Sequence, residues 1–453
     1  MLYRKISGKI EQYLKSNSNK MLVIDGARQV GKSFIIRHVG KKMFTNFIEI
    51  NMELDKQKNR IFEKVFSVED FLLALSSVAG NKMQSKENTL IFIDEIQAYD
   101  HLLTLAKFLM EDGRFTYIAS GSQLGIALRK TQSIPLGSLQ IERMFSLDFE
   151  EFIIANGVGD ALIENMRDKF FNRVSLDDAI HDKMMDLFRK YLLVGGMPDA
   201  VNTFLSEHNL VSVRKIHYDI RKLYKQDAAK YEESFGKKLL IQRIYDLIPS
   251  NLENKKKRVV VKNIEGQKGK RMDNYREEFE YLISSGIALD VLAVSNPIYP
   301  LSESSTKNLL KLYINDVGIL TSMLYRNNLL PIMQDECSVN LGSVYENVVA
   351  QELKAHGFHL HYYDNKKRGE INYLVDDADT TSILPIEVKS GKDYWIHRAL
   401  DGFINASDYD IHQGIVFSNE KNVFEKNGVT YFPIYYSMFL CPCRNDMADY
   451  IEI

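Results

Sequence analysis

At 453 residues the chain is too long for one ordinary hydrophobic core, and a prior of about 150 residues per domain predicts roughly three domains. Apolar residues make up 45% and charged residues 26%, which excludes an intrinsically disordered chain. The formal net charge of −2 excludes a polycation, so any contact with nucleic acid must come from a local basic patch. We see no leader segment and no apolar run long enough to span a bilayer, so we expect a cytoplasmic protein without membrane contact.

A glycine-rich loop follows the first predicted helix (residues 1–20) and a short apolar strand (residues 21–24). The loop fits G-x-x-x-x-G-K-[ST], and its residues are Gly26, Ala27, Arg28, Gln29, Val30, Gly31, Lys32 and Ser33. Glycines allow such a loop to turn its N–H groups toward phosphate oxygens. Lys32 would reach the β and γ phosphates, and Ser33 would hold Mg²⁺. The sequence therefore predicts an ATP and Mg²⁺ site, and the alternative is a glycine-rich turn that binds nothing.

A second predicted strand (residues 44–50) precedes an apolar strand over residues 89–93 that ends in two acids. This order favours a parallel sheet. Asp94 would support the metal ion, and Glu95 would orient the attacking water as general base. The alternative is a buried strand that is followed by an acidic turn without a function.

The next predicted strand, within residues 114–122, ends in small polar residues. Ser120 and Ser122 follow the strand at the place where such a sheet carries a sensor of the γ-phosphate. They are therefore the candidate sensor residues, and an ordinary Ser-Gly-Ser turn is the alternative.

Residues 26–33, 90–97, 120–122 and 147–152 together resemble the AAA-type ATPases whose C-terminal half is a DUF4143 region. The resemblance implies a P-loop ATPase core over residues 1–148. The family often has Gly-Arg or Gly-Lys where this chain has Gly137-Ser138, so Arg143 and Arg129 are the candidates for a basic residue that contacts phosphate.

Helical patterns dominate residues 149–234, which we expect to form a lid or connector. Within it, residues 191–198 contain two glycines and a proline that end a helix; a fixed bend is the expected role, and a moving hinge is the alternative.

Residues 235–305 follow the order helix, basic loop, helix and strand pair, which suits a winged helix. Four consecutive basic residues, 255–258, lie in its loop. They could serve phosphate contacts with DNA or RNA, or they could be solvated lysines on a module that packs against protein.

The C-terminal segment, residues 306–453, carries a helix acid, an acid on one strand and Glu-x-Lys on the next. This is the restriction-endonuclease-like arrangement, in which two carboxylates hold Mg²⁺ and a lysine activates water. The residues concerned are Glu346, Glu370, Asn372, Glu387 and Lys389. The family pattern usually has Asp at position 372, and a neutral amide is a poorer Mg²⁺ ligand, so the sequence disfavours cleavage. Glu370 is the candidate substitute ligand.

Three interpretations of this cluster stay open: an active nuclease, a nuclease-like fold whose charged cluster serves binding or structure, and an ordinary salt-bridged sheet. The predicted fold class is multidomain α/β, with a P-loop parallel sheet, a helical connector, a winged helix and a restriction-endonuclease-like domain.

The leading hypothesis for function is a Mg²⁺-dependent ATPase that acts as a conformational switch for its C-terminal half. One alternative is a nucleotide-gated nuclease or nucleic-acid binder. The other is an ATP-loaded signalling or scaffold protein that turns over slowly. A protein partner or self-association would be compatible with each.

Overall fold

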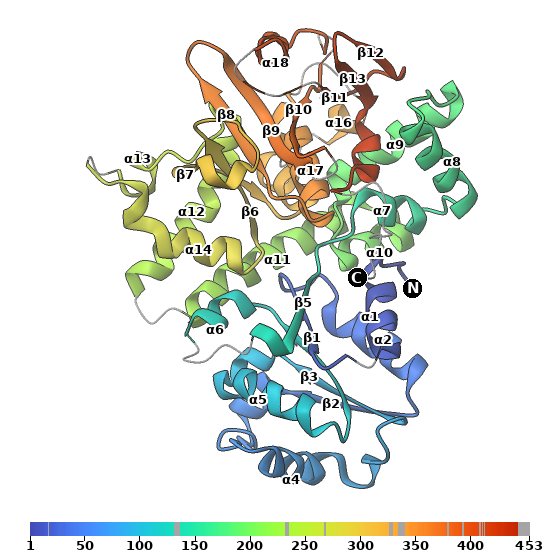
Figure 1. Ribbon diagram of the computed structural model, residues 1–453, viewed down its shortest axis with the longest axis vertical. Coiled ribbons are helices and arrows are strands. Elements are labelled where there is room, and N and C mark those ends of the chain that lie inside the picture. Colours follow the sequence, from blue (N-terminus) through green and yellow to red (C-terminus); the bar gives the residue numbers. More distant parts are fainter. Residues whose placement is uncertain are drawn as a thin grey trace. The chain divides into compact units, whose positions relative to one another are not determined.

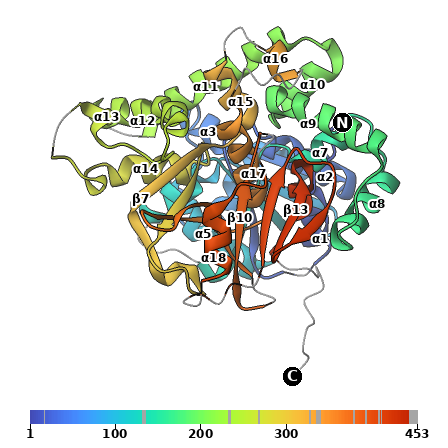
Figure 2. The same ribbon diagram turned by 90° about the horizontal axis from the view of Figure 1, so that it is seen from above.

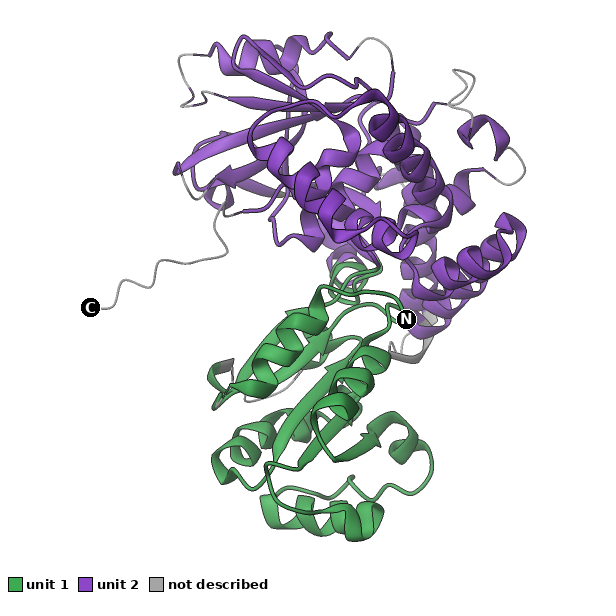
Figure 3. Ribbon diagram, turned by 90° about the vertical axis from the view of Figure 1, so that its right-hand side faces the viewer, with its two compact units in different colours: residues 1–146, 280–287 green, residues 147–279, 288–453 purple. Residues whose placement is uncertain are grey.

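The structure is a computed structural model that describes residues 1–16, 18–130, 136–231, 235–266, 269–325, 329–333, 340–377, 380–391, 394–406, 409, 411 and 413–442. The chain forms two compact units (Figures 1 and 3). Unit 1 comprises residues 1–146 and 280–287, and unit 2 comprises residues 147–279 and 288–453. Each unit is described by itself.

Unit 1 is built on a five-stranded sheet in which every neighbouring pair is parallel, in the order β2-β3-β4-β1-β5. Residues of β1 and β3 are buried along their whole length, as expected for central strands covered on both faces. The strands are β1 (Met21–Asp25), β2 (Asn46–Asn51), β3 (Thr89–Asp94), β4 (Thr116–Gly121) and β5 (Leu139–Arg143).

Helices cover this sheet, and their ends follow local sequence signals. Ser67 caps α4 by accepting a hydrogen bond from the Asp70 N–H, and Gly113 ends α5 in the left-handed region, with φ of 69°. The helices are α1 (Ile6–Lys15), α2 (Lys32–Met43), α3 (Met52–Gln57), α4 (Val68–Ala79), α5 (Asp100–Asp112) and α6 (Leu124–Lys130), with short 3₁₀ turns η1 (Gly80–Lys82), η2 (Ile96–Ala98) and η3 (Leu136–Ser138).

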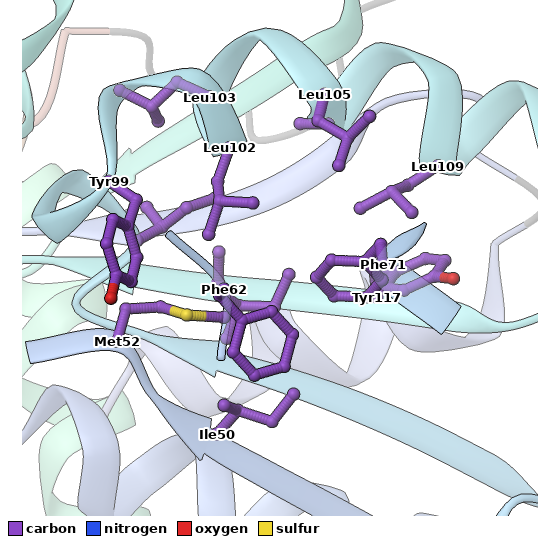
Figure 4. Close-up of a cluster of buried hydrophobic side chains, with 14 of the residues drawn as sticks. Ile50, Met52, Phe62, Phe71, Tyr99, Leu102, Leu103, Leu105, Leu109 and Tyr117 are labelled. Carbon is purple, nitrogen blue, oxygen red and sulfur yellow. The ribbon is translucent and has the colours of Figure 1, made fainter. Parts of the chain in front are cut away.

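A hydrophobic cluster joins alternate strand residues of unit 1 to α4 and α5. Figure 4 shows Leu105 and Leu109 on one helix above the rings of Phe71 and of Tyr117 of β4, with Leu102 of the same helix above Phe62. Burial of such side chains is the main term that stabilises a sheet covered by helices.

Unit 2 contains an eight-stranded mixed sheet in the order β12-β13-β11-β10-β9-β8-β6-β7. Figure 2 shows β13, β10 and β7 in that succession across the sheet. The strands are β6 (Ala288–Val294), β7 (Ser305–Ile314), β8 (His361–Asn365), β9 (Gly369–Asp377), β10 (Ser382–Val388), β11 (Gly414–Ser418), β12 (Phe424–Lys426) and β13 (Val429–Pro433).

The helices of unit 2 are concentrated before this sheet in the sequence, and α17 packs against β6, β7 and β10. They are α7 (Phe149–Ala155), α8 (Asp160–Phe171), α9 (Asp178–Val194), α10 (Pro198–Glu207), α11 (Leu210–Tyr231), α12 (Phe235–Glu253), α13 (Lys262–Glu265), α15 (Val317–Leu324), α16 (Leu330–Met333), α17 (Gly342–Ala355) and α18 (Arg398–Ile404), with 3₁₀ turns η4 (Met272–Tyr275), η5 (Leu301–Ser304) and η6 (Ile434–Phe439). Helix α14 (Arg276–Ser284) begins in unit 2, and its residues from 280 onward belong to unit 1.

The bend after α9 is packed too tightly for side chains. A Cβ on Gly195 would lie 2.1 Å from Asp316 Oδ1, and one on Gly196 would lie 1.9 Å from the Leu147 carbonyl oxygen. The Gly196 N–H donates to Asp316 Oδ2 at 2.7 Å, and the Leu147 N–H donates to the Gly196 carbonyl at 2.7 Å. This packing favours the fixed bend, which stays a prediction.

The five-stranded parallel sheet, the helical region and the C-terminal mixed sheet confirm the predicted α/β fold class. The winged helix and the restriction-endonuclease-like fold stay predictions. In the part of the chain that the structure describes, no helix combines the length and the apolar character that a membrane span needs.

Candidate functional site

The strands of unit 1 all end at one edge of the sheet because they are parallel. At this edge the register pairs Asn51 of β2 with Asp94 of β3. It also pairs Asp25 of β1 with Gly121 of β4 on one side and Arg143 of β5 on the other. The glycine-rich loop begins directly after Asp25, so parallel pairing brings the loop, the two acids and the sensor candidates together.

The backbone of the glycine-rich loop uses conformations that suit glycine. Gly26 has φ of 151°, and a Cβ there would lie 2.2 Å from the Met144 carbonyl oxygen. Gly31 has φ of 98° and immediately precedes α2. Gln29 has φ of 68° without being glycine, and such conformations occur preferentially at functional sites. Lys32 and Ser33 therefore begin a helix whose N-terminal N–H groups are available to an anion.

Lys32 is buried beneath its own loop. Its Nζ donates to the carbonyl oxygens of Gly26 and Ala27, at 2.8 Å each. Burial lowers the pKa of the Lys32 ammonium, and the negative charges of Glu95 and Asp25 partly oppose this effect. A phosphate would supply the full negative charge that neutral carbonyls lack.

Asp94, which is buried, lies where hydroxyl and amide groups converge. Ser33 Oγ donates to Asp94 Oδ1 at 2.9 Å, and Asn51 Nδ2 donates to Asp94 Oδ2 at 2.9 Å. The Ser120 hydroxyl donates to Asp94 Oδ1 as well. Hydroxyl and carboxylate oxygens are the ligands that Mg²⁺ prefers, and Mg²⁺ usually needs only one or two carboxylates when substrate phosphates complete its shell. The residues present therefore fit a phosphate-bound Mg²⁺.

Glu95 adopts a left-handed backbone conformation, with φ of 55°, at the start of η2. Its carboxylate accepts hydrogen bonds from Ser122 Oγ, at 2.7 Å, and from the Gln97 amide. Gly121 leaves room for this amide, because a Cβ there would lie 2.9 Å from Gln97 Oε1. The two sensor candidates thus donate to different carboxylates, Ser120 to Asp94 and Ser122 to Glu95, while Ser120 Oγ also accepts from the Glu95 N–H at 3.5 Å.

Sequence reasoning missed three residues that shape this site. Arg4 donates to the carbonyl oxygen of Val30, within the loop, at 2.8 Å and to that of Phe145 at 2.7 Å. Asn51 and Gln97 bind the two acids, as described above. Their places directly at or after strand ends are a usable signal, whereas nothing in the sequence near Arg4 indicates its role.

Residues 280–287 were missed as well, since they are distant in sequence from the rest of unit 1. Tyr281 accepts a hydrogen bond at its hydroxyl from Gln123 Nε2, at 2.9 Å, and Gln123 lies two residues after the end of β4. The Ile283 carbonyl accepts one from Arg143 Nη2 at 2.8 Å. Of the two candidate basic residues, Arg143 lies at the carboxyl edge of the sheet; the side chain of Arg129 lies outside the described part of the structure.

A second group of polar residues lies in unit 2 around Glu346 of α17. This buried carboxylate forms an ion pair with Lys257 and accepts hydrogen bonds from Asn372 Nδ2, at 3.0 Å, and from the Tyr313 hydroxyl, at 3.2 Å. Asn372 Oδ1 in turn accepts from the Val388 N–H at 2.9 Å. The amide therefore connects the helix acid to the strand that carries Glu387.

Glu387 and Lys389 form an ion pair at 3.2 Å, as two residues on one strand face can. Burial raises the pKa of the Glu387 carboxyl to about 7, against the opposing charge of Lys389. Glu370 is paired differently, with the fully buried Lys311, whose ammonium lies 4.5 Å from the centre of the Tyr362 ring.

The structure thus brings Glu346, Asn372, Glu387 and Lys389 together and binds Glu370 to a lysine on β7. Within the described ranges of the chain, no group of three or more His, Cys, Asp or Glu side chains could by itself hold a metal ion.

Three family models match successive parts of the chain. Residues 18–153 match an AAA domain, residues 185–330 match a domain of unknown function (DUF8612), and residues 341–436 match another domain of unknown function (DUF4143). These matches confirm the resemblance predicted for both ends of the chain. No curated protein matches it.

Solved structures give weaker likenesses. The Walker-type ATPase PABY2304 of Pyrococcus abyssi is 14% identical, with a TM-score of 0.43, over 72% of this chain and 96% of that one. The Aeropyrum pernix ORC1 protein in complex with DNA is 11% identical, with a TM-score of 0.29, over 71% and 92%. The S. cerevisiae Hsp104–ADP complex is 12% identical, with a TM-score of 0.29, over 78% and 43%.

The raised pKa of Glu387 predicts a pH-dependent stability. Between about pH 4.5 and pH 7 the folded chain keeps a proton that the unfolded chain releases, so stability falls as the pH rises through this range. We expect Glu387→Gln to remove this loss. The quantity to compare is the melting temperature of the variant minus that of the native chain. This difference should be about 5 °C larger at about pH 8 than at about pH 5, and thermal unfolding measures it. The exposed Glu303→Gln should show no such trend, and a Glu387→Gln difference independent of pH would contradict the prediction.

Proposed function

We propose that this chain, which carries an AAA domain of the P-loop ATPase type and a DUF4143 domain, is a Mg²⁺-dependent ATPase. Nucleotide binding and hydrolysis would act as a conformational switch for its C-terminal half. The observation that carries the proposal is the convergence of Lys32, Ser33, Asp94 and Glu95 at the carboxyl edge of one parallel sheet. Each has the chemistry that phosphoryl transfer to water requires.

We assign a role to each of these residues from its contacts. Lys32 would exchange its two loop carbonyls for the β and γ phosphates, and the loop N–H groups would hold the remaining phosphate oxygens. Ser33 and Asp94 would hold Mg²⁺, which when bound neutralises charge on the phosphates. Mg²⁺ binding would require no rearrangement of the sheet, because Ser33 and Asp94 already face one another.

Glu95 would orient the attacking water and accept its proton. Its carboxylate is bound by Ser122 and Gln97, so its direction is set before substrate arrives. The hydrogen bond from Ser122 to this carboxylate supports a sensor role for Ser122. Ser120 would act through Asp94, to which its hydroxyl donates.

The phosphate role of Lys32 gives the first test of this proposal. We expect Lys32→Ala to weaken ATP binding at least about tenfold, because a buried charge-assisted contact to phosphate is lost. Isothermal titration with ATP and Mg²⁺ measures this. Lys41→Ala, an exposed change on the same helix, should bind as the native chain does. Equal affinity of Lys32→Ala and native chain would contradict the assignment.

Hydrolysis tests Glu95 separately from binding. Glu95→Gln should lower the turnover rate at least about 100-fold while ATP affinity is kept, because the amide cannot accept the proton of water. Phosphate release under saturating ATP is the measurement, and Glu111→Gln, exposed on α5, is the matched control. Turnover by Glu95→Gln at the native rate would remove Glu95 as the base.

The same assays separate the ATP-loaded scaffold from an ATPase switch. A scaffold protein would keep its nucleotide through purification and turn it over slowly. Rapid turnover by the native chain would exclude that alternative.

A nucleotide-gated nuclease is the second candidate function, and the contacts in unit 2 argue against cleavage. Both Glu346 oxygens already have hydrogen-bond or ion-pair partners, one of them the ammonium of Lys257. Asn372 supplies an amide where a second carboxylate ligand would be needed. The cluster supports a binding or structural role better, and DNA or RNA is its candidate partner.

We therefore expect no Mg²⁺- or Mn²⁺-dependent cleavage of DNA or RNA by the native chain, with or without ATP. Gel assays on single- and double-stranded substrates test this, and Lys389→Ala is the control for contaminating nucleases. Cleavage by the native chain that disappears in Lys389→Ala would establish a nuclease. Cleavage only by Asn372→Asp would identify a nuclease site that has lost one ligand.

A further inference from the structure

A cavity of about 100 Å³ lies in unit 2 on one face of the mixed sheet. Its floor is made by β9, β10, β11 and β13, which are neighbours in the sheet (Figure 1). The register pairs Val375 of β9 with Leu384 of β10, and Ile415 of β11 with Thr430 of β13, so these four side chains lie on the same face. None of them takes part in the nucleotide chemistry or in the charged cluster described above.

Phenylalanine rings form the wall that faces this floor. The ring centre of Phe170, near the end of α8, lies 4.8 Å from that of Phe432 on β13 and 6.0 Å from that of Phe439 in η6. Helix α8 ends at Phe171, and Arg173 then adopts a left-handed conformation, with φ of 57°, in which chains commonly leave a helix. The wall is thus held by a helix end and by a strand, and it is preformed.

Polar groups stand at one end of the cavity, where β9 ends and β10 and β11 begin. Asp376 and Asp377 are the last residues of β9, and Gln413 directly precedes β11. Because β9 runs antiparallel to β10, this end lies at the sheet edge opposite to the one that Glu387 and Lys389 approach. The cavity is therefore a second site, separate from the charged cluster around those two residues.

Two arginines beside the cavity are paired with glutamates. Arg173 lines the cavity and forms an ion pair with Glu425 of β12. Arg167 of α8 lies 4.8 Å from the centre of the Phe439 ring and forms an ion pair with Glu150 at 2.6 Å. Each pair is neutral overall, so the two arginines add no net charge to this region.

The two aspartates therefore make the polar end of the cavity acidic. Burial lowers the pKa of His361, whose positive charge would otherwise act on Asp376, so this imidazole is neutral at about pH 7. A carboxylate that lines a cavity attracts a positively charged group, and it does so more strongly where apolar walls exclude water. The charge at this end is complementary to a cation.

The size and the lining of the cavity indicate the apolar part of a ligand. Atoms that line an apolar void lack contacts that a filling group would supply. A cavity of about 150 Å³ lined by Leu, Ile and Phe binds benzene. The cavity described here is similar in lining, and it opens to solvent beside the exposed Phe171 and Cys441. One aromatic ring therefore suits it, and phenylalanine rings attract both a flat ring and a cation.

We propose that this cavity binds a small organic cation, namely a protonated amine attached to one aromatic ring. The ring fills the space between the phenylalanine wall and the sheet, and the ammonium contacts Asp376. This binding site goes beyond the ATPase function and does not depend on it.

Three ring compounds of nearly equal size test the proposal on the native chain. Benzylamine carries the protonated amine, benzyl alcohol is neutral and benzoate is an anion. The native chain should bind benzylamine at least about tenfold more tightly than benzyl alcohol, because a charge-assisted contact is added, and should bind benzoate more weakly than either. NMR titration measures such weak affinities.

Two variants separate the ammonium contact from the ring contact. Asp376→Asn should weaken benzylamine binding about tenfold and leave benzyl alcohol unchanged, since the amide loses the charge but keeps an acceptor for the Leu301 N–H, now 3.0 Å from Asp376 Oδ1. Thr430→Leu, which fills space at the floor, should weaken both compounds. Asp273→Asn, an exposed change elsewhere in unit 2, is the matched control.

Several results would overturn the proposal. They are a native chain that binds none of the three compounds, a native chain that prefers benzoate or benzyl alcohol, and native affinity of Asp376→Asn for benzylamine. A Thr430→Leu chain that does not fold leaves the comparison with Asp376→Asn decisive. ATP binding is measured separately, so failure of the ATP site and failure of this cavity are distinguishable.

Discussion

The parallel pairing of β1 with β4 and β5 is the constraint on which the nucleotide site depends. Because Asp25 is in register with Gly121 and with Arg143, three loops that are far apart in sequence leave the sheet at one edge. A shift of one residue in either pairing would turn alternate side chains to the opposite face. The register is protected by burial, since the residues of β1 are covered on both faces. The packing of a hydrophobic sheet thus fixes the positions of the residues in the site.

The charged groups of the candidate site contact neutral groups, which a charged ligand can replace. Lys32 is bound to carbonyl oxygens and Asp94 to hydroxyl and amide groups, all of which are neutral. Neutral partners avoid the cost of leaving a buried polar group unpaired, yet they bind more weakly than ionised ones. Such neutral partners are therefore easier to exchange for charged ones. A buried salt bridge between Lys32 and Asp94 would have been harder to open.

The sequence predicted those parts of the structure whose residues lie together in one short stretch of the chain. The loop around Lys32, the acids after β3 and the parallel sheet were predictable, because each follows from a short pattern with a known physical cause. Arg4 and residues 280–287 were not, because they reach the site only through folding. The partner of Glu370 in unit 2 could not be predicted for the same reason. Its spacing from Asn372 allowed a shared site, but in the fold it pairs with the buried Lys311, which lies 59 residues earlier in the sequence. Spacing fixes which strand face a residue occupies, and tertiary packing decides what it meets there.

The cluster in unit 2 shows how the amide of Asn372 affects the charge balance among its neighbours. An aspartate at position 372 would bring a further negative charge close to Glu346 and Glu387. Asn372 instead donates to Glu346 and accepts from the Val388 N–H, so it satisfies both neighbours without charge. Lys257 and Lys389 then balance the two remaining acids. The amide of Asn372 and the two lysines thus supply polar and positively charged partners to both acids.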